Sequence, residues 1–270
     1  MDAEHALISA ATFVGTHVLA WFFAGLVLLL LGVALSLHLL QRYPLRHASG
    51  QHSTVVLIAR FATGFLAILA CAMLFAELAD EIELEEDLAQ IDLSLSQAVK
   101  KHTAAGVVQT FAYITHLGDP PVLIALGVIV AIALFAFRQR WLALGWVITV
   151  SGNGLLNPAL KEIFQRLRPQ DESGRALVEG WSFPSGHSSG AVVFYGMLGY
   201  VLIRLTPRSW HLPLALLLAM IAFSTGASRL FLQYHYASDV LAGFASGTAW
   251  LLICISAMEY MRWHRERHSS

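Results

Sequence analysis

Three charged residues lie between two long apolar runs near the end of the chain, in the stretch Ser228-Arg-Leu-Phe-Leu-Gln-Tyr-His-Tyr-Ala-Ser-Asp239. A charge in such a place either faces water or takes part in a site. If the segment after it is helical, His235 and Asp239 share a face, and the carboxylate can orient the imidazole as a nucleophile or a base. Arg229 adds a fixed cation suited to a phosphoryl oxygen. The alternative is that all three lie at the level of the lipid headgroups, and these residues alone do not decide between the two.

A second group of cations follows an apolar run, in Lys161-Glu-Ile-Phe-Gln-Arg-Leu-Arg168-Pro169. The seven-residue interval predicts that Lys161 and Arg168 lie two turns apart on one helical face, about 10 Å along the axis. Pro169 then limits the helix. Two cations so spaced could bind a dianionic group from both sides, although taken alone they are more typical of interfacial anchors.

The third stretch, Pro184-Ser185-Gly186-His187, precedes another apolar run. Ser185 or Ser188 can cap a helix there, and Gly186 lets backbone N–H groups turn toward a ligand, which predicts an anion site at the helix end. His187 could give a proton to a leaving oxygen. A Ser-Gly turn before a helix is common, so this stretch is informative only beside the other two.

Together, the three stretches resemble the three-part signature of the type-2 phosphatidic acid phosphatase superfamily, which also includes the vanadium-dependent haloperoxidases. The residues that carry the resemblance are Lys161-x6-Arg168-Pro169, Pro184-Ser185-Gly186-His187 and Ser228-Arg229-x5-His235-x3-Asp239. Every signature position is filled. The resemblance covers about 161–239 by motif and 55–258 by the pattern of apolar runs.

The resemblance implies a role for each signature residue. His235 would form a phosphohistidine, Asp239 would orient it, and His187 would protonate the leaving group. The phosphoryl oxygens would be bound by Lys161, Arg168, Ser185, the Gly186 amide and Arg229. Fixed cations and helix-end amides can neutralise a phosphoryl group without Mg²⁺, and no carboxylate cluster suggests a metal site, so no cofactor is expected. Three neighbours match no signature position and are interpreted as surface or packing residues: Arg166, Arg175 and Tyr234.

The composition of the 270-residue chain is that of a membrane protein. Hydrophobic residues make up 57% and charged residues 13%, with a mean hydropathy of +0.63. The net charge is −1, so the chain has no overall positive charge that would attract nucleic acid. Cys71 and Cys254 lie inside apolar runs and are expected to be small buried hydrophobes rather than a disulfide pair or metal ligands.

Seven apolar runs are candidate membrane spans, which predicts an all-α, polytopic membrane helical bundle. They occupy 18–40, 55–76, 120–137, 141–160, 188–204, 212–228 and 239–258. By the resemblance, residues 1–54 form an extra N-terminal transmembrane helix with a cytoplasmic loop, and residues 55–270 form the six-helix phosphatase domain. The fourth run is polar and small in its second half, which favours close helix packing over substrate contact; the residues are Ser151, Gly152, Asn153, Gly154, Asn157 and Pro158.

The loops between these runs differ in charge when the spans alternate across the membrane. One side receives Arg42, Arg46, Arg60, Arg138, Arg140, Arg204, Arg208, Arg262, Arg265 and Arg267, and the positive-inside rule makes that side cytoplasmic. The signature stretches face outward, with an acidic stretch from Glu77 to Asp92 that is expected to be a surface helix with a solvated face rather than a metal site. Asp119, before two prolines, is expected to cap a helix.

These features predict an enzyme of a cell membrane, with a bacterial inner membrane expected, that hydrolyses a lipid phosphate or diphosphate at the outer face. Undecaprenyl diphosphate, phosphatidylglycerophosphate and phosphatidate are the substrates that the resemblance suggests. A lipid phosphotransferase is an alternative, because an acceptor hydroxyl can attack a phosphohistidine in place of water. A non-enzymatic transporter or lipid-binding protein is disfavoured because its charges would line a path through the bilayer, whereas these cluster at one face. A haloperoxidase is a third alternative, and it is disfavoured because those relatives are soluble whereas this chain has the composition of a membrane protein.

Overall fold

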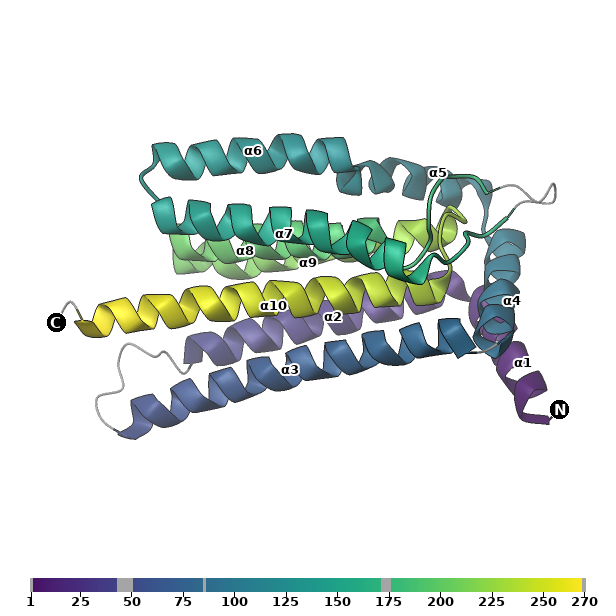
Figure 1. The fold of residues 1–270 in the computed structure, drawn as a ribbon, viewed down its shortest axis with the longest axis horizontal. Coiled ribbons are helices and arrows are strands. Elements are labelled where there is room, and N and C mark those ends of the chain that lie inside the picture. Colours follow the sequence, from purple (N-terminus) through teal and green to yellow (C-terminus); the bar gives the residue numbers. More distant parts are fainter. Residues whose placement is uncertain (1, 43–50, 85, 171–175, 269–270) are drawn as a thin grey trace.

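The computed structural model describes residues 2–42, 51–84, 86–170 and 176–268, so Arg46, Glu85 and Arg175 lie outside the described residues. The described chain is mostly helical, and the longest connection that it includes, residues 165–170 and 176–185, lies between α7 and α8 (Figure 1). In order, the elements are α1 (Asp2–Thr16), α2 (Val18–Arg42), α3 (Gln51–Leu84), α4 (Glu86–His102), α5 (Ala105–Ile114), the 3-10 helix η2 (Thr115–Gly118), α6 (Pro120–Ala136), α7 (Arg140–Phe164), α8 (Gly186–Leu205), the 3-10 helix η3 (Arg208–Trp210), α9 (His211–Phe231) and α10 (Ala237–His268). The predicted all-α fold is confirmed.

All seven predicted spans are helices, but they are not equally apolar. Within the described ranges, stretches long and apolar enough to cross a membrane occur in α2, α3, α8, α9 and α10. The run at 120–137 corresponds to α6, which has 17 residues and forms a span only together with α5 and η2, from which it is bent by 43°. This bend follows from the sequence, because residues before a proline disfavour the helical conformation and two prolines begin α6.

α7 has 25 residues but is not among the helices that are apolar enough to span by composition. Its polar side chains instead face the bundle: Asn153 and Asn157 are buried, and Nδ2 of Asn157 donates to Oγ of Ser189 at 3.1 Å. At Gly152 the ring of Trp250 lies so close that a Cβ would not fit. The predicted close packing is confirmed at Gly152 and Asn157.

α8 is the inner helix of the bundle and packs against α7, α9 and α10. Its side chains Ala191, Val193 and Met197 are at most 1% exposed and belong to a core cluster with Trp146 of α7 and Leu218 of α9. By contrast, no residue in the most apolar window of α3 is buried, as expected for a helix that faces lipid rather than water. The N-terminus of α8 is therefore near the centre of one end of the bundle.

The first predicted span, α2, is packed into the same bundle through aromatic contacts. Phe22 lies edge-on to Phe111 of α5 and to Phe231 of α9, with ring centroids 5.3 and 5.9 Å apart, and stacks on Phe223 at 5.5 Å. Gly25 also faces Phe223. Aromatic pairs at these distances add to the energy of burial, so α2 contributes to the packing of α5 and α9.

The acidic stretch from Glu77 to Asp92 is not the single surface helix that the sequence predicted. Its first part continues α3 to Leu84, and its last part begins α4, which lies across the end of the bundle beside α1 (Figure 1). Asp92 is 3% exposed. The prediction of a solvated face is wrong for Asp92, because an arginine inside the bundle is its partner.

Among the described residues, the arginines that the sequence predicts to be cytoplasmic lie at the end of the bundle opposite the signature stretches, as the ends of α2, α7, α8 and α10 show (Figure 1). At the arginine end, Nε of Arg208 donates to Oε1 of Gln41 at 3.1 Å. A cavity of about 560 Å³ lies there between α7, α8 and α10, with Arg140 and Arg204 in its lining. Arg140 precedes Lys161 by 21 residues of one helix, or about 30 Å, so this cavity is not part of the signature site.

Candidate active site

The stretch that begins with Lys161 does not form the helical face that the sequence predicted. α7 ends at Phe164, and Gln165 has a left-handed backbone with φ 43°. The chain therefore leaves the helix before Arg168, which also precedes Pro169 and so avoids the helical conformation. The prediction that Lys161 and Arg168 share one helical face is wrong. The two cations still lie close enough for their charges to repel each other.

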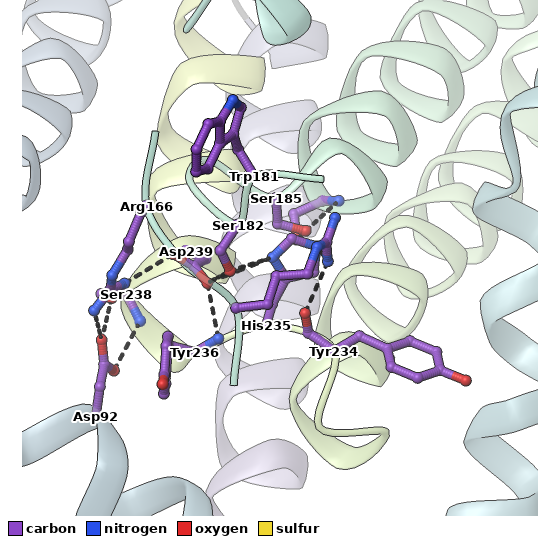
Figure 2. Close-up of polar contacts among 12 residues, drawn as sticks. Asp92, Arg166, Trp181, Ser182, Ser185, Tyr234, His235, Tyr236, Ser238 and Asp239 are labelled. Carbon is purple, nitrogen blue, oxygen red and sulfur yellow. Dashed lines mark hydrogen bonds and ion pairs between the residues drawn. The ribbon is translucent and has the colours of Figure 1, made fainter. Parts of the chain in front are cut away.

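His235 and Asp239 form a buried pair at the junction between α9 and α10 (Figure 2). Nδ1 of His235 lies 3.4 Å from Oδ2 of Asp239, and the two side chains are 2% and 0% exposed. His235 precedes α10, so a turn rather than a shared helical face brings the two together. The turn is held by the backbone N–H of Tyr236, which donates to Oδ2 of Asp239 at 2.8 Å.

Ser182, which sequence reasoning missed, contacts both members of this pair. Its hydroxyl donates to Oδ2 of Asp239 at 2.5 Å and lies 3.3 Å from Nδ1 of His235 (Figure 2). Ser182 is fully buried and precedes the signature serine by three positions. Sequence alone provides no signal for it, because a serine in a loop is ordinary.

The second ring nitrogen of His235 faces a cation. Because the carboxylate of Asp239 accepts from Nδ1–H, the lone pair of the neutral ring is on Nε2, which accepts from Nη1 of Arg168 at 3.1 Å. The same guanidinium is fixed by the backbone carbonyls of Tyr234 and Gly180, both at 2.9 Å. Burial lowers the pKa of His235 to about 4, with Asp239 opposing the shift. The imidazole is therefore neutral at neutral pH.

Arg166, interpreted from the sequence as a surface or packing residue, is instead part of the site. Its Nη1 donates to Oδ1 of Asp239 at 2.8 Å and its Nη2 donates to Oδ2 of Asp92 at 2.8 Å (Figure 2). Ser238 completes the network by donating its hydroxyl to Asp92 and accepting from Arg166 at 2.7 Å. Burial alone would lower the pKa of Arg166, but Asp239 and Asp92 raise it. Arg166 thus remains charged and holds the oxygen of Asp239 that does not face His235.

Lys161 holds the segment that leads into the α8 turn. Its Nζ donates to the backbone carbonyls of Trp181 at 2.5 Å and Ser182 at 3.2 Å. Its charge also interacts with those of Arg168 and Arg229. Three cations that repel one another favour the binding of an anion between them.

Ser185 is the N-cap of α8. Its Oγ accepts from the N–H of Ser188 at 3.3 Å, so the prediction that Ser185 or Ser188 caps this helix is confirmed for Ser185. The N–H of Ser185 donates to the backbone carbonyl of Asp239 at 2.9 Å. α10 approaches this turn closely because Gly243 lacks a side chain: a Cβ there would lie 2.5 Å from the carbonyl oxygen of Ser185. The amides that begin α8 at Gly186 lack intrahelical partners and can bind an anion.

Asp119 is the N-cap residue of α6, as predicted from Pro120 and Pro121, but its side chain makes no cap hydrogen bond. Oδ1 of Asp119 instead lies 3.0 Å from Nε2 of His187, and Oδ2 lies 2.7 Å from Nδ1 of His116. Sequence reasoning missed this contact because Asp119 and His187 are 68 positions apart. The two prolines mark the start of a helix, where aspartate is a common N-cap residue, so the sequence suggested no other role for Asp119.

Arg229 reaches the site from the last turn of α9 and is 5% exposed. Its Nη1 donates to Oγ1 of Thr115 in η2 at 2.8 Å, and its guanidinium lies 4.4 Å from the centre of the Tyr234 ring. Tyr234, interpreted from the sequence as a surface or packing residue, thus contacts Arg229 with its ring and Arg168 with its carbonyl. The chain thus brings Lys161, Arg168 and Arg229 to one end of the bundle from three different segments.

Comparisons with known proteins find relatives over this part of the chain. Residues 140–263, which include all three signature stretches, match the model described as the PAP2 superfamily. A stretch of 136 residues, 50% of this chain, is 38% identical to phosphatidylglycerophosphatase B of Bacillus subtilis (strain 168) and spans 66% of that protein, just under two thirds. The fold is similar to the crystal structure of a transmembrane PAP2 type phosphatidylglycerolphosphate phosphatase from Bacillus subtilis, with a TM-score of 0.65 and 31% identity, over 72% of this chain and 96% of that chain.

Proposed function

This chain belongs to the PAP2 superfamily, and we propose that it is an integral membrane phosphatase that hydrolyses a lipid phosphate or diphosphate through a phosphohistidine at His235. One observation carries the proposal: the buried imidazole has Nδ1 against Asp239 and Nε2 against Arg168. A neutral ring whose Nε2 lone pair faces a fixed cation is suited to attack a phosphoryl group once that cation turns to a phosphoryl oxygen.

In the first step, Nε2 of His235 attacks phosphorus, so that a P–N bond forms and the P–O bond to the lipid breaks. The phosphoryl oxygen takes the place of Nε2 as the partner of Arg168. Asp239 stabilises the positive charge that develops on the imidazole, and a proton moves from His187 to the leaving oxygen. The non-bridging oxygens are bound by Lys161, Arg168, Arg229 and the amide of Gly186, with Ser185 holding the turn that carries this amide.

In the second step, water attacks the phosphohistidine. An O–P bond forms, the P–N bond breaks, and the proton of the water moves to His187, which was left neutral by the first step. Inorganic phosphate then leaves, and both histidines are restored. If a lipid hydroxyl replaced water here, the product would be a new phospholipid, so product analysis with and without an added lipid alcohol distinguishes hydrolysis from phosphotransfer.

The substrate we propose belongs to the class of phosphatidylglycerophosphate, phosphatidate and undecaprenyl diphosphate. Both relatives described above carry names that refer to phosphatidylglycerophosphate. The site lies at an end of the bundle (Figure 1), where a lipid headgroup would meet it. We place this end on the outer side of the membrane, because the arginine-rich end then lies on the cytoplasmic side.

The proposal is tested with the full-length protein in detergent and a panel of these lipids, one phosphate of each carrying a radioactive label. The wild type should release phosphate, and rapid quenching should trap a protein-bound phosphate that is stable in base and labile in acid. His235→Ala should lower turnover by at least about 10³-fold and leave no trapped phosphate. His5→Ala, an exposed histidine of α1, is the matched control. A labelled phosphoenzyme that persists in His235→Ala would disprove this role for His235.

A further inference from the structure

The break between α5 and α6 reaches the site although it belongs to none of the three signature stretches. It comprises η2 and Asp119, with the sequence Thr-His-Leu-Gly-Asp. Thr115 accepts from the guanidinium of Arg229 at 2.8 Å. The carbonyl of Leu117 accepts from the hydroxyl of Tyr195 in α8 at 2.8 Å. One short turn thus touches a phosphate-binding cation and the helix whose first turn carries His187.

Gly118 allows this turn to lie directly on the site. A Cβ at Gly118 would overlap the methyl group of Thr225 and come within 3.0 Å of Cδ2 of His187. Thr225 is fully buried in α9, so it has little room to move. The absence of a side chain at Gly118 therefore brings the next residue, Asp119, within hydrogen-bond distance of the His187 ring.

Asp119 contacts one defined nitrogen of His187. Its Oδ1 lies 3.0 Å from Nε2, and its Oδ2 is held by Nδ1 of His116 at 2.7 Å. A carboxylate accepts from Nε2–H, which leaves Nδ1 as the nitrogen that can exchange a proton with a substrate. The cations Arg229 and Arg168 lie near the His187 ring. Asp119 is the carboxylate that offsets them.

We propose that Asp119 is a positioning residue for proton transfer, which holds His187 with Nε2–H toward its carboxylate so that Nδ1 serves the leaving oxygen. The inference rests on the proposed function. In the first step Nδ1–H gives its proton to the leaving oxygen, and Asp119 stabilises the imidazolium before that transfer. In the second step the lone pair on Nδ1 accepts a proton from the attacking water. Thr115 of the same turn fixes Arg229 and has no part in the proton transfer.

The test compares two substrates with the same tail and different leaving groups. Phosphatidate must expel an alkoxide, which needs a proton, whereas diacylglycerol diphosphate expels a phosphate monoester, which needs one far less. The Asp119→Asn variant keeps a hydrogen-bond acceptor at this position but has no charge. Asn is also as good an N-cap residue as Asp. We expect rapid-quench formation of the phosphoenzyme to slow by about 10²-fold with phosphatidate and by only a few-fold with the diphosphate.

Thr115→Val is the matched variant in the same turn. It removes the acceptor for Arg229, so KM should rise for both substrates by similar factors, without dependence on the leaving group. If Asp119→Asn also slows both substrates by one factor, Asp119 has only a structural role and the inference is overturned. Restoration of the phosphatidate rate by Asp119→Glu would support it, because the charge would then be what matters.

A second measurement does not depend on turnover. Ring-¹⁵N histidine NMR of the wild type, with His187→Asn used for assignment, should show the neutral His187 ring protonated at Nε2, and Asp119→Leu, which removes the acceptor, should lose this single tautomer. A wild type that releases no phosphate from any lipid but keeps this tautomer would disprove the proposed function while leaving the contact established. A ring protonated at Nδ1 would overturn the inference even in an active phosphatase.

Discussion

Arg166 donates to Oδ1 of Asp239 at 2.8 Å, while the opposite oxygen of the same carboxylate faces His235. The second terminal nitrogen of Arg166 donates to Asp92 of α4, also at 2.8 Å. The side chain of Arg166 is 10% exposed and the two carboxylates are 4% and 0% exposed. The orientation of Asp239 therefore depends on a helix that lies across the end of the bundle and carries no signature residue.

Arg166→Met should destabilise the protein, because it leaves two buried carboxylates without their cation. Breaking a buried ion pair costs about 3–5 kcal/mol, and Asp239 would also lose one of the bonds that orient it, so turnover should fall with Tm. The measurement is thermal unfolding in detergent together with phosphate release. Arg140→Met, at an exposed arginine of the other end, is the control. An unchanged Tm for Arg166→Met would contradict the network.

His235 should contribute to the loss of stability in acid. Burial lowers its folded pKa to about 4 from an ordinary value of 6.5, so between these values the unfolded chain binds a proton that the folded chain does not. The contribution of this ring to the free energy of unfolding is fully present above about pH 6.5 and decreases as the pH falls toward 4. At pH 5 the loss should be about 2 kcal/mol. The drop in Tm from pH 7 to pH 5 should therefore be smaller in His235→Gln than in the wild type. Equal drops would mean that burial does not lower the pKa of His235 below its value in the unfolded chain.

Activity should survive metal removal. The proposed site neutralises the phosphoryl group with Lys161, Arg168 and Arg229 and requires no Mg²⁺. Turnover in excess EDTA should remain within about two-fold of the untreated rate, and vanadate, which can take the trigonal-bipyramidal geometry of the transition state, should inhibit competitively. Loss of activity in EDTA with recovery on addition of Mg²⁺ would show that a metal supplies part of the charge.

The signature end should face the outside of the cell. Single cysteines at Glu179 and Ser209, both exposed and at opposite ends, are introduced after Cys71→Ala and Cys254→Ala. A membrane-impermeant thiol reagent should label Glu179→Cys in intact cells and Ser209→Cys only after lysis. The reverse pattern would place the proposed chemistry on the cytoplasmic side.

Gly243→Ala should damage the site without touching a catalytic side chain. The added methyl group would lie 2.5 Å from the carbonyl oxygen of Ser185 and 2.8 Å from Cβ of Ser188. Separating α10 from the α8 turn should cost about 1–3 kcal/mol and lower turnover. Gly32→Ala, where a Cβ would meet nothing within 4 Å, should be neutral or slightly stabilising. Equal Tm values for the two variants would show that the close approach does not constrain the helices.

Sequence reasoning succeeded where interactions are local or compositional. The apolar runs predicted seven of the described helices, because a stretch of that length has few other structures available in a membrane. The N-cap at Ser185 and the contact between His235 and Asp239 were also predictable, since both depend on positions three or four residues apart. These are distances over which the backbone itself determines which side chains can meet.

The missed residues have partners that are distant in sequence. Arg166 meets Asp92 across 74 positions, and Asp119 meets His187 across 68. Contacts between residues so far apart along the chain produce no periodic pattern in the sequence. The expectation of one helical face for Lys161 and Arg168 failed for a related reason: the left-handed turn at Gln165 is stabilised by contacts with later segments, such as the bond from the Ser182 N–H to the Arg166 carbonyl at 2.8 Å.

Asp239 belongs to α10, the last helix that the structure describes, whereas Arg166 and Ser182 belong to segments that are synthesised earlier. A growing chain therefore contains Lys161, Arg168 and the first turn of α8 well before it contains either the nucleophile or its carboxylate. Only when α10 has entered the bundle can Asp239 meet Arg166 and hold His235. By the proposed mechanism, incompletely inserted copies cannot attack the lipids around them, and hydrolysis begins only with completed assembly.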